Sequence, residues 1–248
     1  MLLSIFRQSK HKLKNLWKDV NFKFFALRNP TTAQIIRKVI EKHLSYLSQE
    51  ALCDLAQAAI HNERKGITGV IIEAGCALGG SAITLASAKS SCRSLFLYDV
   101  FGMIPSPSIR DGQDVHNRYQ KIITGRAEGL GSQLYYGYEE NLYGKVVQSF
   151  VDFGLDIKGN NIKLVQGLYE DTLKVEVPVA LAHIDCDWYD SVLTCLQQIE
   201  PHLVSGGTLV IDDYDHWSGC KRAVDEYFVD KKFAYYFIKK NRLHIVKK

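Results

Sequence analysis

The chain has 248 residues, 46% of them hydrophobic and 23% charged, which fits one globular α/β domain with a full core and excludes extensive disorder. No apolar run approaches the roughly 18 residues that a spanning helix needs, so a transmembrane protein is excluded as well. The net charge of +4 arises in residues 1–28, where seven Lys or Arg residues face one acid. The rest of the chain lacks the charge pattern of a nucleic-acid-binding protein.

Residues 10–25 predict an amphipathic helix with a basic face. Its apolar face would hold Leu13, Leu16, Trp17, Val20 and Phe24. Such a helix can pack on its own domain or on a second copy, or it can lie on an anionic membrane surface. We expect packing, in a homo-oligomer, and keep peripheral membrane contact as the alternative.

Two further helices are predicted before the first strand. Pro30 opens one that continues to about Leu47, and Ser48 is a good N-cap for one that runs past Ile60. Residues 1–65 therefore form a helical N-terminal cap that covers the sheet edge or roofs the site. We expect a single domain, with the core in residues 66–248.

The first predicted strand, residues 69–73, ends in Glu73 and runs into a glycine-rich turn over residues 74–81. Glycines let a ligand approach the backbone, and the following helix offers free N–H groups. A second buried strand, residues 94–99, ends in Asp99, where a carboxylate can bind both hydroxyls of a ribose. Together the two segments predict a nucleotide-type cofactor site.

The pattern breaks between about residues 102 and 158. This insertion contains prolines, glycines and many tyrosines, and a short helix is expected near its end, at residues 146–153. Long interruptions between strands are usually lids or substrate-binding segments. His116 is an open candidate for substrate contact there.

Four acids follow two predicted buried strands, residues 179–184 and 207–211, which come after a third at 161–166. A helix over residues 190–202 makes the first two one βαβ unit, so Asp185, Asp187, Asp212 and Asp213 should meet at one edge of the sheet. Carboxylates packed together call for a cation, and oxygen ligands favour Mg²⁺, Ca²⁺ or Mn²⁺. The alternative is that these acids are solvated helix caps.

Residues 218–230 predict a helix, and residues 233–238 with 242–246 predict a terminal hairpin. His183 is either a buried, hydrogen-bonded histidine or a base, and His216 with Trp217 either wall an acceptor pocket or pack in a loop. The six cysteines form no CxxC pair. Reduced thiols of this kind predict a cytoplasmic protein.

Between residues 45 and 228 the motifs resemble the macrocin O-methyltransferase-like family, metal-dependent sugar O-methyltransferases within class I of the S-adenosylmethionine-dependent enzymes. The resemblance is carried by the segments 73–81, 98–101, 167–173, 183–189, 206–214 and 219–228. It implies a Rossmann-like α/β fold with a mostly parallel seven-stranded sheet and an antiparallel terminal hairpin.

The resemblance also implies residue roles. Asp185, Asp212 and Asp213 correspond to ligands of Mg²⁺ (or Mn²⁺), and Asp187 corresponds to the general base. The residues that correspond to contacts with S-adenosyl-L-methionine are Glu73, Gly75, Ser81, Asp99 and Gly167.

The expected function is thus O-methylation of a sugar hydroxyl on a small natural product. A metal-bound hydroxyl is easier to deprotonate, and two adjacent sugar hydroxyls suit a metal. The alternatives are methylation of a polyketide or peptide secondary alcohol, methylation of a catechol, and a non-catalytic nucleotide-binding or membrane-associated scaffold.

Overall fold

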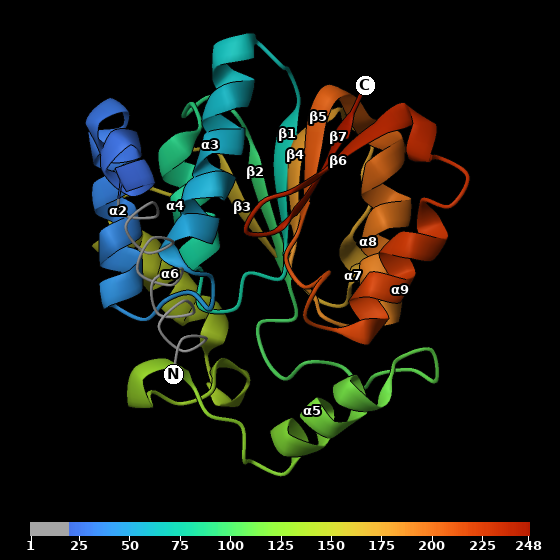
Figure 1. Ribbon diagram of the computed structural model, residues 1–248. Helices are drawn as coiled ribbons and strands as arrows, with labels where there is room; N and C mark the ends of the chain where they lie inside the picture. The colour runs from blue at the N-terminus through green and yellow to red at the C-terminus, as the bar shows by residue number, and fades with distance from the viewer. Residues whose placement is uncertain (1–19) are drawn as a thin grey trace, which may run out of the picture.

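The structure is a computed structural model in which residues 20–248 are described, and it is built on a seven-stranded sheet (Figure 1). The strands are β1 (Val70–Ala74), β2 (Leu95–Asp99), β3 (Ile162–Gln166), β4 (Val179–Ile184), β5 (Leu203–Ile211), β6 (Tyr235–Lys239) and β7 (Leu243–Lys247). Their order is β3-β2-β1-β4-β5-β7-β6, with β7 antiparallel to both neighbours and all other pairs parallel. The predicted mostly parallel sheet with a terminal hairpin is confirmed.

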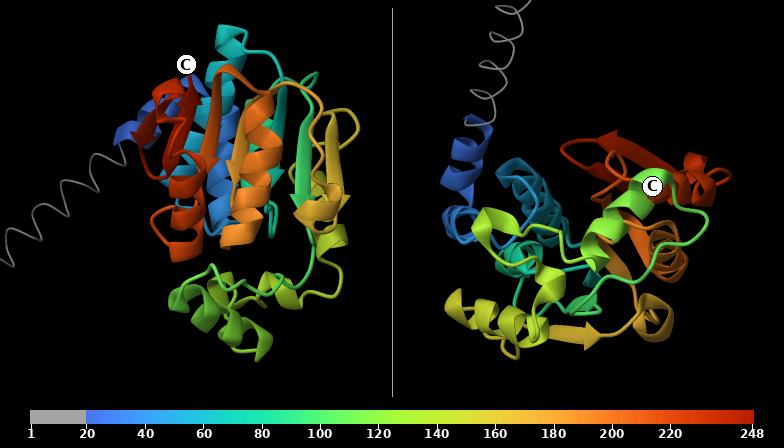
Figure 2. Two further views of the ribbon diagram at one scale, coloured as in Figure 1. Left: turned by 90° about the vertical axis from the view of Figure 1, so that its right-hand side faces the viewer. Right: turned by 90° about the horizontal axis from the view of Figure 1, so that it is seen from below.

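Helices cover both faces of the sheet (Figures 1 and 2). The helices are α2 (Pro30–Glu41), α3 (Gln49–Lys65), α4 (Gly80–Ala88), α5 (Gln113–Ile123), α6 (Leu142–Asp152), α7 (Tyr169–Thr172), α8 (Tyr189–Ile199) and α9 (Ser218–Tyr227), with short 3-10 turns η1 (Leu130–Ser132), η2 (Tyr136–Tyr138), η3 (Glu200–His202) and η4 (Lys232–Ala234). One layer contains α2, α3, α4 and α6, and the other contains α7, α8 and α9. Helix α5 lies beyond the end of the sheet instead of on a face (Figure 2).

The strands form where the sequence has short apolar runs, because both faces of a parallel sheet are buried under helices. All six residues of β4 are buried, and alternate residues of β1 point into different layers. Ile71 belongs to the core under α2, α3 and α4, whereas Ile72 belongs to the core under α8 and α9. The strand predictions were therefore correct to within a residue or two, except for β5.

Strand β5 is longer than the sequence suggested, because it begins at Leu203 instead of residue 207. Ser205 and Gly206 are residue types that suit a turn after a helix, but they lie within the strand. Gly206 has a φ of 77°, and the register with β4 shifts between Val179 and Leu181. An irregularity of this kind inserts extra backbone without ending the strand.

The N-terminal helices lie on a face of the sheet, where α3 packs against α4, β4 and β5. This corrects the expectation that they cover an edge. Helix α2 ends at Glu41, short of Leu47, and Ser48 caps α3 as predicted, accepting a hydrogen bond from the Ala51 N–H. The loop between the two helices does reach the site, as described below.

Residues 20–28 are helical, but the face that packs is not the predicted one. Phe22 and Phe25 are buried in the core, whereas Val20 and Phe24 are about half exposed, at 52% and 55%. The sequence pattern does not show which face is buried, because Phe22 and Phe25 lie on one face of the helix and Phe24 lies on the other. Leu13, Leu16 and Trp17 lie outside the described residues.

The insertion contains a helix that the sequence analysis did not predict. Helix α5 exposes polar side chains along most of its length, with Val115 and Ile122 buried, so its apolar signal is weak. Helix α6 starts four residues before the predicted short helix. Within residues 20–248 no helix is long and apolar enough to cross a membrane, and all six cysteines there are free thiols.

Candidate active site

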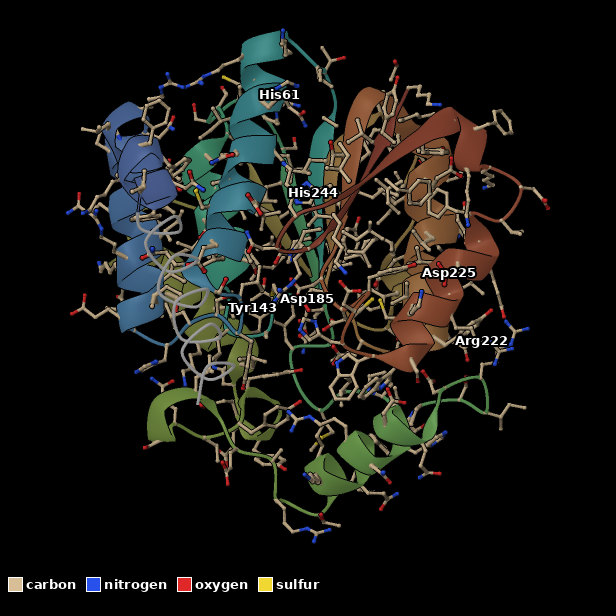
Figure 3. All side chains as sticks on the ribbon, in the orientation of Figure 1. His61, Tyr143, Asp185, Arg222, Asp225 and His244 are labelled. Atoms are coloured by element: carbon tan, nitrogen blue, oxygen red, sulfur yellow. The ribbon has the colours of Figure 1, made fainter. Side chains whose placement is uncertain are left out.

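The four predicted acids converge at the carboxyl ends of the central strands. Asp185 and Asp187 follow β4, while Asp212 and Asp213 follow the neighbouring strand β5. Figure 3 shows Asp185 at the end of the sheet that faces α5. Together the acids line one pocket of 270 Å³. Parallel pairing places both strand ends at one edge, so the convergence follows from the topology.

Carboxylate oxygens in this pocket lie close enough to share a cation. Ligand atoms of Asp185, Asp187 and Asp213 all lie within 4.8 Å of one another, and so do those of His183, Asp185 and Asp212. The predicted metal ligands are thus divided between two overlapping groups that share Asp185. Asp187, predicted as the base, belongs to the first group.

Burial and mutual repulsion raise the pKa of most of these acids. Burial raises the pKa of Asp185 well above its usual value, with repulsion from Asp212 adding to it, and burial together with Asp187 and Asp185 does the same to Asp213. Within the described chain, Oδ2 of Asp213 is buried without a hydrogen-bond partner. A set of acids that destabilise one another and keep an unpaired oxygen is suited to a cation.

Asp212 differs from its neighbours because two cations hold it. Its Oδ1 lies 2.6 Å from Nε of Arg242 and 3.4 Å from Nε2 of His183. Although burial opposes ionisation, the hydrogen bond from His183 and the charge of Arg242 hold the pKa of Asp212 below its usual value. Asp212 is therefore the member of the group whose ionised form its neighbours stabilise.

His183 is the buried, paired histidine of the two readings that the sequence left open. Its side chain is 0% exposed, and its Nδ1 lies 3.2 Å from Oε1 of Glu73, an ion-pair distance. The charges of Glu73 and Asp212 outweigh burial, so the pKa of His183 is raised well above its ordinary value. The imidazole ring, placed between Glu73 and Asp212, links β1 to the end of β5 across β4.

The turn after β1 is held by Asp99. Its Oδ2 accepts hydrogen bonds from the backbone N–H groups of Cys76 and Ala77, at 2.8 and 3.0 Å, and its Oδ1 accepts one from Phe101 at 2.7 Å. Ala77, Phe101 and Asp187 all have positive φ angles, which are rare outside glycine. Strained backbone of this kind gathers at functional sites.

The predicted cofactor residues separate into two sets. Gly75 and Asp99 line both the acidic pocket and a narrower neighbouring pocket, and Gly167 precedes Leu168, which lines the narrower one. Glu73 and Ser81 line neither pocket. They pair with each other behind the turn, where the Ser81 hydroxyl donates to Oε1 of Glu73. The role of each as a cofactor contact remains a prediction.

Aromatic rings and two arginines form most of the remaining walls of the acidic pocket. They are Tyr46, Arg118, Tyr135, Tyr136, His216, Trp217 and Arg242. The rings of Tyr135 and Tyr136 lie 4.4 Å apart between centroids, and the guanidinium of Arg118 lies 5.4 Å from the Tyr135 ring. Burial raises the pKa of Tyr135 to about 12, so its hydroxyl stays neutral. His116 is not among the residues that line either pocket.

Three of these residues were missed by the sequence analysis. Tyr46 comes from the loop between α2 and α3, Arg118 from α5, and Arg242 from the turn between β6 and β7. Tyr46 lies at the start of the segment that resembles the family, so the resemblance could have pointed to it. No local pattern marks Arg118 or Arg242, because each reaches the pocket only through tertiary packing.

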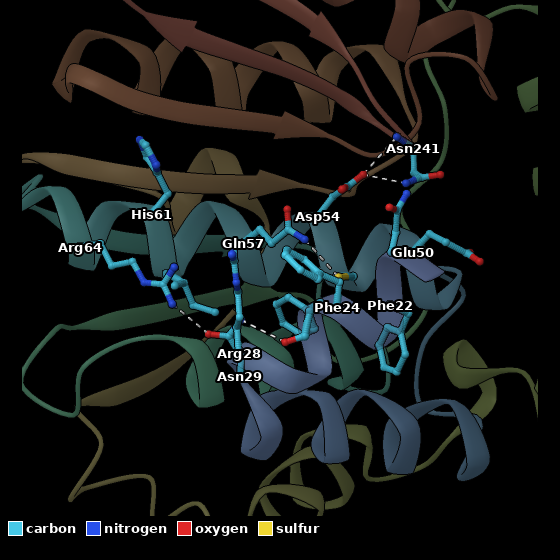
Figure 4. Close-up of a pocket in the computed structure, with 14 residues that line it drawn as sticks. Phe22, Phe24, Arg28, Asn29, Glu50, Asp54, Gln57, His61, Arg64 and Asn241 are labelled. Atoms are coloured by element: carbon cyan, nitrogen blue, oxygen red, sulfur yellow. Dashed lines mark hydrogen bonds between the residues drawn. The ribbon is translucent and has the colours of Figure 1, made fainter. Parts of the chain in front are cut away.

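A larger groove of 710 Å³ lies elsewhere, between residues 20–29, α3 and the hairpin turn at Asn241 (Figure 4). Its polar groups mostly pair with one another: Asn241 donates to Asp54, and Arg64 donates to Asn29. None of the four acids lines it. It is therefore not the catalytic candidate.

The strand order, the acids at the carboxyl edge and the glycine turn define a Rossmann-like methyltransferase fold. Among solved structures, the O-methyltransferase NovP is similar over 83% of this chain and 81% of its own, at 22% identity and a TM-score of 0.67. A family model described as macrocin O-methyltransferase matches residues 42–239. The chain belongs to the macrocin O-methyltransferase family.

Two relatives share 27% identity with this chain over 168 residues, or 65% of its length. One is the demethyldecarbamoylnovobiocin O-methyltransferase of Streptomyces niveus, of which 58% is covered. The other is the 8-demethyl-8-(2,3-dimethoxy-alpha-L-rhamnosyl)-tetracenomycin-C 4'-O-methyltransferase of Streptomyces olivaceus, of which 59% is covered. The chain thus spans somewhat less than two thirds of the relatives that it matches.

Proposed function

We propose that the protein transfers a methyl group from S-adenosylmethionine to a sugar hydroxyl of a small natural product, with a divalent metal bound. The observation that carries this proposal is the shared boundary of two pockets. Gly75 and Asp99, on the glycine-turn side, and Asp185 and Asp187, on the acid side, line both of them. A donor and an acceptor bound in adjoining pockets would meet at these residues.

The turn after β1 suits the cofactor. Gly75 presents bare backbone to both pockets, and Asp99 presents a buried carboxylate beside it. When bound, S-adenosylmethionine would supply an electrophilic methyl group on a sulfonium. The chain's part is to fix that group's direction, and the three backbone hydrogen bonds to Asp99 keep the turn rigid enough to do so.

The acids fit Mg²⁺ or Mn²⁺, held by Asp185, Asp212 and Asp213. The unpaired Oδ2 of Asp213 and the raised pKa values of Asp185 and Asp213 support a site that binds a cation. When bound, the ion would polarise the acceptor hydroxyl and lower its pKa. Arg242 and His183 keep Asp212 ionised and in place.

Asp187 is the proposed base. Burial and repulsion from Asp212 raise its pKa, while hydrogen bonding with Asp213 and the charge of Arg118 oppose that rise, so the carboxylate is both basic and held in place. It would take the hydroxyl proton as the oxygen attacks the methyl carbon. Tyr135 and Tyr136 line the same pocket, and aromatic side chains are a kind of surface on which sugar rings pack.

The proposal is tested with a panel of glycosylated and sugar-free acceptors, assayed for methyl transfer with Mg²⁺ present and with chelator. We expect transfer to glycosylated acceptors, loss of transfer in chelator, and a drop of about 100-fold or more in Asp187→Asn. The matched control is Asp190→Asn, which removes an exposed carboxylate three residues away. Its activity should equal that of the parent.

Other outcomes would select the alternatives. Turnover confined to sugar-free acceptors would favour a secondary alcohol or a catechol as the natural acceptor. Full activity in chelator would remove the metal from the mechanism and leave base catalysis by Asp187. Cofactor binding without turnover of any acceptor would favour the non-catalytic scaffold.

We further propose a homo-oligomer in which the exposed side chains of residues 20–28 are covered. Phe24, which is 55% exposed, lines the groove of Figure 4, and Leu27 in the same helical segment is 82% exposed. Phe24→Asp with Leu27→Asp should shift the mass measured by light scattering to that of a monomer. A parent that is already monomeric and binds anionic liposomes would instead favour the membrane. The cytoplasmic location stays a prediction.

A further inference from the structure

Two helices begin directly after the acid loops, and neither caps itself. The N-cap residues of α8 and α9 are Trp188 and Trp217, whose side chains have no acceptor for the free N–H groups of the first turn. Both helices instead receive a carboxylate from the insertion. Asp111 Oδ1 accepts from the Tyr189 N–H at 2.8 Å, and Asp114 Oδ2 accepts from the Ser218 N–H at 2.9 Å.

The chain leaves room for these contacts by means of two glycines. A Cβ atom on Gly219, in the first turn of α9, would lie 2.0 Å from Oδ1 of Asp111. A Cβ atom on Gly112, just before α5, would lie 2.2 Å from Oγ of Ser218. Gly219 opens the family segment 219–228, which none of the catalytic roles uses. The close approach of the insertion to α9 explains why position 219 requires a residue without a side chain.

Further contacts fasten the same junction. The indole Nε1 of Trp188 donates to the Pro105 carbonyl at 2.9 Å, and the rings of Trp188 and Trp217 lie edge to face with centroids 6.0 Å apart. The Ser218 hydroxyl donates to Oδ1 of Asp114. Asp111 is 8% exposed, so its carboxylate is enclosed at the junction and is not a solvated surface acid.

The junction decides where α5 lies relative to the acids (Figures 1 and 2). Asp111 and Asp114 stand immediately before and within the first turn of α5, and Arg118 is on the same helix, one turn further on, in the wall of the acidic pocket. On the other side of the junction, Trp188 follows Asp187 directly. One pair of helix caps therefore connects the acceptor wall to the acid loops.

We propose that Asp111 and Asp114 are positioning residues that clasp the α5 insertion to the first turns of α8 and α9, so that the acceptor wall and the acid loops are set as one unit. This inference rests on the proposed function for its effect on the acceptor. Whether the two carboxylates hold residues 101–123 in place does not depend on the reaction. The attachment of the insertion and its effect on the acceptor can therefore be tested separately.

The test compares Asp111→Ala, Asp114→Ala and the double variant with the parent by hydrogen exchange. Amides of α5 and of the first turns of α8 and α9 should exchange about fivefold faster in each single variant and about 30-fold faster in the double variant. Amides of α2 and α3 should be unchanged. Asp111→Asn and Asp114→Asn, which keep a side-chain oxygen acceptor, should restore most of the protection.

Kinetics supply the second readout. The double variant should raise the KM for the acceptor by about tenfold or more, while the Kd for S-adenosylhomocysteine by calorimetry stays within about twofold of the parent value. The control is Ser90→Ala, which removes a side-chain oxygen that accepts a hydrogen bond from the Cys92 N–H in the loop between α4 and β2. It should leave the exchange of α5 and the acceptor KM unchanged.

Two results would overturn the inference. If α5 exchanges at the parent rate in the double variant, the caps do not hold the insertion. If α5 loosens but the acceptor KM stays at the parent value, the clasp does not position the acceptor. A parent that methylates no acceptor would count against the proposed function alone, because the exchange result still judges the clasp.

Discussion

Gly75→Ala should damage the site where its two halves touch. A Cβ atom on Gly75 would lie 1.9 Å from the carbonyl oxygen of Asp185 and 2.8 Å from its carbonyl carbon. Both are backbone atoms at the end of β4, where the Asp185 N–H is bonded to the Ala74 carbonyl at 2.9 Å, so neither can swing away. Strand ends β1 and β4 would have to separate.

Two costs add at Gly75, and a control isolates the first. Alanine at a positive φ costs roughly 1–2 kcal/mol, and this applies both to Gly75 (φ 90°) and to Gly66 (φ 64°), the C-cap of α3. Nothing lies within 4 Å of a Cβ atom on Gly66. Displacing packed backbone costs about 1–3 kcal/mol more. We therefore expect a loss of about 2–5 kcal/mol in Gly75→Ala against about 1–2 kcal/mol in Gly66→Ala.

Urea denaturation measures both losses, provided that the m-values of the variants match that of the parent. Calorimetry with S-adenosylhomocysteine should show weaker binding in Gly75→Ala and parent-like binding in Gly66→Ala. Equal stability losses in the two variants, with cofactor affinity kept in both, would refute the reasoning. Such a result would mean that the turn can accommodate a Cβ atom at position 75 without separating the strand ends.

Two more predictions concern buried ionisable groups. In His244→Leu the loss of stability between pH 7 and pH 5 should be about 2 kcal/mol smaller than in the parent. Burial lowers the pKa of His244 to about 3 in the folded chain. Between about pH 6.5 and pH 3, only the unfolded chain therefore binds a proton at this residue, and the stability of the fold decreases as the pH is lowered. Urea titrations at both pH values measure this, and equal pH dependence in the two proteins would contradict it. Asp99→Ala should weaken S-adenosylhomocysteine binding by about tenfold or more and destabilise the fold by about 1–3 kcal/mol, because three backbone donors lose their acceptor. Unchanged affinity in calorimetry would remove Asp99 from the cofactor site.

Local sequence determined the sheet and the place of the acids. Short apolar runs predicted β1, β2 and β4, because strands that are buried on both faces need such runs. Because the chain order of strands and helices implied parallel pairing, Asp185 and Asp213 could be assigned to one edge before any coordinate was known. The cap at Ser48 was equally readable, since a cap depends on residues three positions apart.

Tertiary structure decided the partners of those acids and the walls around them. Arg242 lies 30 residues from Asp212, and Asp111 lies 78 residues from the helix that it caps at Tyr189. No periodicity in the sequence links such positions, because a carboxylate selects its donor by distance in space. Helix α5 was missed because most of its side chains are polar and exposed, and its buried Ile122 packs with Ala127 and Tyr135, partners that only the folded insertion brings together.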